Sequence, residues 1–278
     1  MAERMYFSRI CDGLVDEKLS YSGALLIEGP KWCGKTWTGK HAAKSVLYMQ
    51  DPDKGAGYME LSRTMPSRLL KGEKPRLIDE WQEAPVLWDA VRFDVDQTGE
   101  WGQYILTGSA TPRDDNMPKH TGTGRIARLR MRPMTLFESK ESIGSVSLRQ
   151  LFEGQEDAEG ESPLGIPELA KVICRGGWPE AVAKGQTSAQ IARNYVDAVV
   201  NVDVQKVDGV ERNPYRVRQL LRSYARNIST MASLTTVLAD IQANDVAFSH
   251  TTMYGYVNAL RRIFLIEDIP AWKPSLRS

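Results

Sequence analysis

Residues 24–36 read Ala-Leu-Leu-Ile-Glu-Gly-Pro-Lys-Trp-Cys-Gly-Lys-Thr, a short apolar strand pattern that runs into Gly-x-x-x-x-Gly-Lys-Thr at 29–36. This spacing is typical of a phosphate-binding loop, whose glycines let backbone N–H groups curl around a phosphate. Lys35 is expected to reach the outer phosphates, and the Thr36 hydroxyl to bind Mg²⁺. A helical stretch, 35–43, follows directly, as anion binding at a helix N-terminus requires. The alternative is a glycine-rich turn that binds no nucleotide.

The loop predicts ATP with Mg²⁺ as the ligand and ADP as the product. The candidate nucleotide-binding residues are contiguous and comprise Gly29, Pro30, Lys31, Trp32, Cys33, Gly34, Lys35, Thr36 and Trp37. Because Cys33 lies inside the loop, we expect nucleotide binding to be sensitive to alkylation of its thiol.

A second buried-strand pattern, Arg-Leu-Ile-Asp-Glu-Trp at 76–81, ends in two adjacent carboxylates. In nucleotide hydrolases the first carboxylate, here Asp79, holds the Mg²⁺ with its water shell, and the second, here Glu80, polarises the attacking water. Adjacent side chains on a strand point to opposite faces, so Glu80 must act from the strand end, where the chain turns. The candidate metal ligands are therefore Thr36 and Asp79. A solvated Asp-Glu turn is the alternative.

Strand and helix patterns alternate along the first half of the chain. We expect helices at 6–19, 35–43 and 85–96, and strands at 24–28, 45–49, 76–81, 102–108 and 126–131. This alternation predicts an α/β fold with a parallel sheet covered by helices on both faces. Ligands of such sheets bind at the carboxyl ends of the strands, where the phosphate loop begins.

The strand that ends in Leu-Thr-Gly-Ser at 106–109 adds two hydroxyl groups. If it neighbours the strand before the phosphate loop, these hydroxyls lie beside the γ-phosphate. Ser109 or Thr107 is then expected to sense the terminal phosphate or to orient the attacking water. The same letters also suit a plain turn.

Arg125 follows the glycine-rich stretch 121–124 and begins a strand. An arginine there offers a planar cation to the phosphates of its own or a neighbouring subunit's nucleotide. The start of the strand lies at the sheet edge away from the nucleotide of the same subunit, which favours the neighbour and a homo-oligomer. The alternative is a structural ion pair with Asp114 or Asp115.

The composition of the 278 residues is that of an ordinary soluble protein, with 42% hydrophobic and 26% charged residues. No apolar run is long enough to span a membrane and the N-terminus carries no signal-peptide core, so we expect a cytoplasmic protein without membrane contact. Three widely spaced cysteines fit neither a disulfide framework nor a zinc site. Mg²⁺ with the nucleotide is the only metal expected.

The second half reads as helical. An acidic, apolar-poor stretch at 153–161 marks a linker or surface loop and a domain boundary near residue 150. We expect helices at 167–174, 187–205, 214–227, 232–241 and 249–262, and a strand at 263–269. The order helix, helix, strand at the end resembles a winged helix.

Basic residues gather toward the C-terminus. Residues 212–278 carry a net charge of +5, against +1 for the whole chain. Arg218, Arg222 and Arg226 share one helix face, which predicts contact with the phosphate backbone of DNA. A solvated face, or one that docks on the acidic linker, is the alternative.

Several runs resemble the prokaryotic AAA-type ATP-binding proteins in which an ATPase domain precedes a domain of unknown function, DUF4143 (the AAA_14/DUF4143 family). They are the loop at 29–36, Leu-Ile-Asp-Glu-Trp-Gln at 77–82, Ile-Leu-Thr-Gly-Ser at 105–109, Gly-Thr-Gly-Arg at 122–125, Met-Arg-Pro-Met at 131–134 and Arg-Gly-Gly-Trp-Pro at 175–179. The resemblance implies a P-loop NTPase of the AAA+ type with strand order 5-1-4-3-2. It also implies Lys35 and Thr36 on phosphate and Mg²⁺, Asp79 on Mg²⁺ and Glu80 as catalytic base.

Members of that family continue past the motif at 270–278 into a region that resembles the restriction-endonuclease fold, so the resemblance implies a truncated member. The expected organisation is an ATPase domain at 1–150, a helical linker or lid at 151–210 and a winged-helix-like region at 211–278. The leading function is an ATP-hydrolysing switch whose helical tail moves with the nucleotide state. The alternatives are an ATP-regulated DNA-associated protein and a small-molecule kinase, against which the adjacent Asp79 and Glu80 argue.

Overall fold

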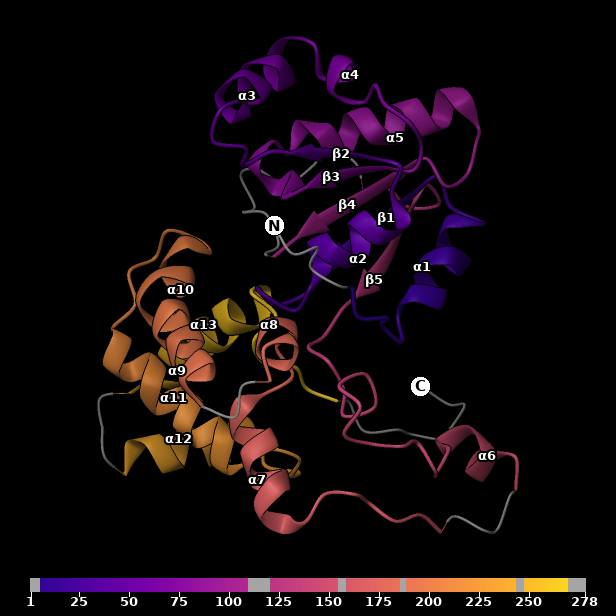
Figure 1. The fold of residues 1–278 in the computed structure, drawn as a ribbon. Coiled ribbons are helices and arrows are strands. Elements are labelled where there is room, and N and C mark those ends of the chain that lie inside the picture. Colours follow the sequence, from indigo (N-terminus) through magenta and orange to yellow (C-terminus); the bar gives the residue numbers. More distant parts are fainter. Residues whose placement is uncertain (1–5, 110–120, 155–158, 186–188, 244–247, 270–278) are drawn as a thin grey trace, which may run out of the picture. The chain divides into compact units, whose positions relative to one another are not determined.

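The computed structural model describes residues 6–109, 121–154, 159–185, 189–243 and 248–269 (Figure 1). The chain divides into two compact units, Met1–Asp197 and Ala198–Ser278. The first contains the parallel sheet, and the described part of the second is helical. The compact units divide after Asp197. The domain boundaries expected near 150 and 210 remain a prediction.

Strands and helices alternate at the start of the first unit, as expected. The strands are β1 (Ala24–Glu28), β2 (Ser45–Tyr48), β3 (Arg76–Asp79), β4 (Tyr104–Gly108) and β5 (Ile126–Arg130). The helices are α1 (Asp12–Leu19), α2 (Lys35–Ala42), α3 (Gly55–Thr64), α4 (Pro66–Leu69), the 3-10 turn η1 (Trp81–Glu83) and α5 (Val86–Thr98). Farther along the chain follow α6 (Leu148–Phe152), α7 (Ile166–Arg175), α8 (Pro179–Ala183) and α9 (Gln190–Ala198).

All five strands pair in parallel in the order β2-β3-β4-β1-β5. Read from the other edge, this is the expected order 5-1-4-3-2, so the predicted P-loop α/β fold class is confirmed. The register sets Asp79 of β3 beside Thr107 of β4, and Thr107 beside Ile27 of β1. The carboxyl ends of these three neighbouring strands therefore meet at one edge of the sheet, next to the phosphate loop.

Alternate residues of the strands supply two hydrophobic layers, one on each face of the sheet. On one face, Leu26, Ile78 and Leu106 pack in a cluster with residues of α4 and α5. On the other face, the sheet residues Leu25 and Ile27 cluster with residues of α1 and α2. Figure 1 shows α3, α4 and α5 along the first face and α1 and α2 along the second. The sheet is thus covered on both faces, and its continuous apolar strands reflect burial on both sides.

The helix expected at 6–19 begins only at Asp12. The segment before it is held by side chains instead: the Arg9 amide donates to Asp12 Oδ2 at 2.7 Å, and the Tyr6 hydroxyl donates to Asp12 Oδ1 at 2.6 Å. Asp12 therefore satisfies groups ahead of the helix, and residues 6–9 are non-helical. The apolar periodicity of this segment did not reveal that change.

The described part of the second unit consists of the π-helical stretch η3 (Val199–Asp203) with α10 (Val204–Lys206), α11 (Pro214–Arg226), α12 (Leu234–Gln242) and α13 (His250–Arg262). Side chains at the N-termini cap the last three helices: Asn213 accepts from the Tyr215 amide, Ser233 from Thr236 and Ser249 from Thr252. The apolar faces meet in a core that includes the fully buried Val217, Leu220, Met253, Val257 and Leu260.

The strand expected at 263–269 does not form. After α13 the chain turns sharply: the Phe264 amide donates to Arg261 O at 2.9 Å, the Leu265 amide donates to Leu260 O at 3.0 Å, and Phe264 has a left-handed φ of 59°. These bonds close the helix end, and a lone apolar segment without a partner strand cannot form a ladder. The described residues of the expected winged-helix region therefore form α11, α12 and α13 but no strand. No helix in the described ranges is long and apolar enough to cross a membrane.

Candidate nucleotide-binding site

The phosphate loop lies between β1 and α2, as its sequence predicts. Gly34, which precedes the helix, has a left-handed φ of 103° that glycine adopts without strain. Gly29 lies so close to the main chain that an added Cβ would be 2.1 Å from Met131 O. Both glycines are therefore required by the path of the loop, and its backbone wraps tightly against the segment after β5.

Lys35 is the buried cation of the loop and is 5% exposed. Its ammonium donates to Gly29 O at 3.0 Å and to Pro30 O at 2.8 Å, so the side chain bridges the loop from within. Burial lowers the pKa of Lys35, and the nearby Cys33, Glu80 and Asp79 counteract that effect. The ammonium thus lies inside the loop, against its carbonyl oxygens.

Asp79 ends β3 and is the meeting point of two hydroxyl groups. Its Oδ1 accepts from Thr36 Oγ1 at 2.8 Å and from Thr107 Oγ1 at 2.6 Å. The two predicted metal ligands, Thr36 and Asp79, therefore lie side by side. Hydroxyl and carboxylate oxygens are the hard ligands that suit Mg²⁺, which keeps waters and substrate phosphates as its remaining ligands. The residues fit a Mg²⁺–nucleotide.

Glu80 lies one residue beyond the strand, at a turn. Its left-handed φ of 57° redirects the chain between β3 and η1, as the expected action from a strand end requires. The carboxylate Oε2 accepts from Ser109 Oγ at 3.4 Å and also contacts Gln82 Nε2. Burial raises the pKa of Glu80, while the contact with Gln82 and the charge of Lys35 counteract the effect. A raised pKa favours proton uptake by a carboxylate.

The two hydroxyls on β4 contact different carboxylates. Thr107, which is fully buried, bonds Asp79, whereas Ser109 bonds Glu80. Sequence reasoning had offered either residue for one role. The structure brings Ser109 to the candidate base and Thr107 to the candidate metal ligand.

Arg125 does not join this cluster. Its carbonyl accepts from the Ala24 amide at 3.0 Å, which places it at the amino ends of β1 and β5, opposite the phosphate loop. The half-exposed guanidinium pairs with Asp96 of α5 at 2.6 Å, and this hydrogen bond lowers the pKa of Asp96. Asp114 and Asp115, the partners offered as an alternative, lie outside the described residues.

The expected reactivity of Cys33 is wrong. Its side chain is fully buried, and its Sγ lies 3.8 Å from Met131 O. Burial raises the pKa of the thiol, and Lys35 and Arg9 counteract that effect. Because the thiolate is the nucleophile, a buried thiol of raised pKa resists alkylation. Position inside the loop did not reveal that the side chain points into the core.

Aromatic side chains outside the predicted site pack against the loop. Trp32, which is 56% exposed, lies 5.5 Å from the Tyr195 ring of α9, and Tyr195 lies 4.4 Å from the Trp178 ring. A Cβ added at Gly34 would lie 3.4 Å from Pro179 Cγ. The Arg-Gly-Gly-Trp-Pro motif at 175–179 therefore lies at the loop. Only the family resemblance had drawn attention to it.

In the second unit, the arginine face on α11 is only partly free for a ligand. Arg226 forms an ion pair with Asp240 of α12. Arg222 is exposed and Arg218 is half-buried. Contact of this face with DNA stays a prediction.

Comparisons with known proteins divide the chain in two. Residues 21–140 match the family model described as an AAA domain (AAA_14), and residues 166–278 match a domain of unknown function, DUF8612. The expected DUF4143 domain is therefore wrong. Most runs that carried that resemblance lie within the first match, so they constrained the first domain far more than the second. No curated protein matches the chain.

Solved structures are similar only at a distance. They include AMPPCP-bound DnaA of Aquifex aeolicus, with 15% identity, coverage of 90% of this chain and 86% of that chain, and a TM-score of 0.39. A DNA replication initiation factor has 12% identity, 92% coverage of both chains and a TM-score of 0.39. A RuvB variant of Thermotoga maritima has 16% identity, 89% and 87% coverage and a TM-score of 0.32. Nothing about ligand or activity follows from scores this low.

The match to the AAA domain spans the whole sheet and the phosphate loop. The matched residues also include Lys35, Thr36, Asp79 and Glu80. Residues 21–140 thus form a parallel α/β domain with a phosphate-loop sequence, and they are similar to the AAA domain family.

Proposed function

We propose that this protein binds ATP with Mg²⁺ and hydrolyses it, acting as a nucleotide-driven switch. The observation that carries the proposal is the contact of Thr36 with Asp79 at 2.8 Å, directly beside the buried Lys35 of the phosphate loop. The loop, a candidate Mg²⁺ pair and a further carboxylate thus converge at one edge of the sheet. The AAA domain match supports the same conclusion.

In the proposed complex, the backbone N–H groups of residues 31–36 surround the β- and γ-phosphates. The Lys35 ammonium exchanges its bonds to the carbonyls of Gly29 and Pro30 for phosphate oxygens. Thr36 and Asp79 would hold the Mg²⁺, which neutralises phosphate charge when bound. Thr107 holds the Asp79 carboxylate in place through its hydrogen bond.

Glu80 is the proposed general base. Its burial and raised pKa suit the removal of a proton from the attacking water. Ser109 and Gln82 contact the same carboxylate oxygen and therefore set its direction. For catalysis, Ser109 is the residue expected to respond to the terminal phosphate, since it joins β4 to Glu80.

The test is phosphate release from ATP and Mg²⁺ without any added acceptor, in the parent and in Glu80→Gln. Glutamine keeps the size and accepts the Ser109 hydrogen bond but removes no proton. We expect Glu80→Gln to keep ATP affinity and to slow turnover by roughly 10²–10⁴-fold, the usual contribution of a general base. Equal turnover in the two proteins contradicts the assignment of Glu80. Release that requires an acceptor identifies a kinase instead.

The arginine face of α11 supports a second candidate function, ATP-regulated association with DNA. Arg222 is exposed, and residues 212–278 carry a net charge of +5. Contacts with phosphate release counterions, so retention on DNA should fall steeply as salt rises. Retention that ignores salt, or that survives Arg222→Gln unchanged, removes this candidate.

A further inference from the structure

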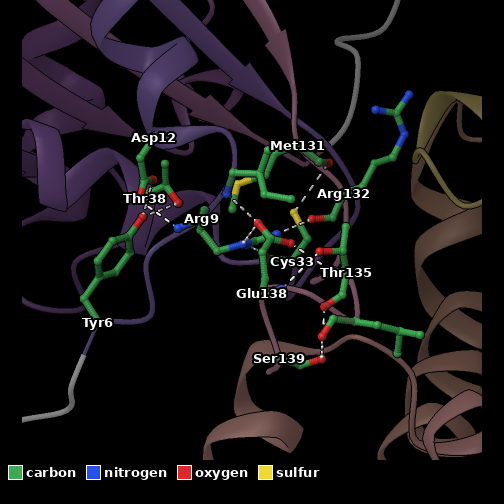
Figure 2. Close-up of polar contacts among 12 residues, drawn as sticks. Tyr6, Arg9, Asp12, Cys33, Thr38, Met131, Arg132, Thr135, Glu138 and Ser139 are labelled. Carbon is green, nitrogen blue, oxygen red and sulfur yellow. Dashed lines mark hydrogen bonds and ion pairs between the residues drawn. The ribbon is translucent and has the colours of Figure 1, made fainter. Parts of the chain in front are cut away.

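A buried guanidinium supports the phosphate loop from behind (Figure 2). Arg9, which precedes α1, is 8% exposed and donates to three acceptor groups at once. Its Nε bonds Glu138 Oε1, its Nη1 bonds the carbonyl of Cys33 and its Nη2 bonds the carbonyl of Arg132, each at 2.8 Å. The planar fork thus joins the N-terminal segment, the phosphate loop and the segment after β5. Lysine has no such fork.

Glu138 fixes the direction of that fork. Its Oε1 also accepts from the Ile10 amide at 2.8 Å, and its Oε2 accepts from the Thr135 amide at 2.7 Å. Both side chains of the pair are 5% exposed. Burial raises the pKa of Glu138, but the bonds from Arg9, Thr135 and Ile10 outweigh it and hold the pKa below its usual range. The carboxylate is therefore charged and fully engaged at neutral pH.

The contact with Cys33 matters because of peptide geometry. A trans peptide unit is planar, and its C=O and N–H point in opposite directions. When Arg9 holds the Cys33 carbonyl on the outer side of the loop, the N–H of Gly34 is turned to the inner side. A flipped peptide would direct a carbonyl oxygen at the phosphate instead. Glycine at 34 leaves the backbone free to flip, so an external hold is needed.

We propose that Arg9, held by Glu138, is a positioning residue that orients the Cys33–Gly34 peptide for phosphate binding. The inference rests on the proposed ATP-binding function of the loop. Arg9 itself contacts no ligand in this proposal, because each of its three guanidinium nitrogens already donates to Glu138 or to one of the two carbonyls. Its contribution is the shape of the loop before the nucleotide arrives.

The experiment compares Arg9→Lys and Glu138→Gln with the parent. Arg212→Lys is the matched control, since Arg212 is also buried, pairs bidentately with Asp208 and donates to the carbonyl of Val204, but lies in the second unit. The first readout is alkylation of Cys33 by iodoacetamide in nucleotide-free protein, measured by peptide mass spectrometry with the exposed Cys174 as internal reference. The second is ATP affinity by calorimetry, with circular dichroism as the folding check.

Loss of the Arg9–Glu138 pair should raise the Cys33 alkylation rate, relative to Cys174, and weaken ATP binding. The expected factor is about tenfold or more for each, which corresponds to one charge-assisted hydrogen bond. Arg212→Lys should change neither, although it lowers the thermal unfolding midpoint. This contrast separates positioning of the loop from a general loss of stability.

Three results overturn the inference. The first is a protected Cys33 in folded Arg9→Lys and Glu138→Gln, the second is an exposed Cys33 with unchanged ATP affinity, and the third is an equal effect in Arg212→Lys. In a further outcome, the parent binds no ATP and Cys33 becomes exposed in Arg9→Lys and Glu138→Gln. This outcome contradicts the proposed function but supports the proposal that Arg9 and Glu138 hold the loop in shape. The alkylation readout thus tells the two failures apart.

Discussion

At the scale of single residues, neighbours decide what each carboxylate of the site can do. Asp79 accepts two hydroxyl hydrogen bonds and lies beside the loop, whereas Glu80, the next residue, is turned away by a left-handed backbone and contacts Ser109. We therefore propose that Asp79 binds the metal and that the adjacent Glu80 activates the water molecule. The sequence placed both carboxylates at the strand end. Their partners could not be read from the sequence. Thr107 meets Asp79 because of the strand register, and Gln82 meets Glu80 because of the turn after β3.

Glu138 gives a pH prediction at this scale. Its folded-state pKa is lowered, so its stabilising contribution is complete above the unfolded pKa and is lost as the pH falls through the folded pKa. With an unfolded pKa of about 4.3, the thermal midpoint of the parent should exceed that of Glu138→Gln by a constant margin above about pH 5. The margin should shrink below about pH 4. Scanning calorimetry of both proteins measures it, and a margin that stays constant into acid contradicts the prediction.

At the scale of elements, the first unit shows what patterns of residues can specify. The apolar strands and the helices between them were predictable because burial on both faces leaves continuous apolar runs. The helix at 6–19 was expected too long because Asp12 bonds Tyr6 and Arg9, a local polar contact that periodicity does not register. The segment 263–269 has strand composition, yet it lacks a strand partner and closes the end of α13. Sheet formation depends on partners that composition does not supply.

The candidate site also combines local motifs with contacts between residues that are distant in the sequence. The phosphate loop and the Asp-Glu pair are local sequences, and their places followed from the motifs. Arg9 lies 24 residues before Cys33 and 129 before Glu138 in the sequence, so only the fold brings them together. Arginine before a first helix carries no signal of that role. Arg9 is recognised in the structure by its burial, since only 8% of it is exposed.

At the scale of the whole molecule, Arg125 bears on assembly. Arg125 lies at the end of the sheet opposite its own phosphate loop. If it contacts a phosphate, that phosphate must therefore belong to the nucleotide of a neighbouring subunit. An arginine finger contributes about 10³–10⁵ in rate. We expect a mixture of Arg125→Ala and Lys35→Ala proteins to recover part of the ATPase activity that neither has alone. The mixed subunits retain one intact Lys35 and one intact Arg125.

Phosphate release across mixing ratios measures the recovery, and light scattering shows whether the subunits associate. A mixture that associates but stays inactive rules out a trans role. Arg125 then serves as a structural partner of Asp96, the ion pair that the structure shows at 2.6 Å.

We propose above all that residues 29–36 with Asp79 bind ATP and Mg²⁺. Calorimetric titration of ATP into the parent and into Lys35→Ala, each with Mg²⁺ and with chelator, tests it most directly. Lys35 is the buried cation of the loop, so its removal should abolish detectable binding, while the circular dichroism spectrum stays that of the parent. We expect Mg²⁺-dependent binding of ATP in the parent and none in Lys35→Ala. Equal ATP affinity in the two folded proteins would contradict it.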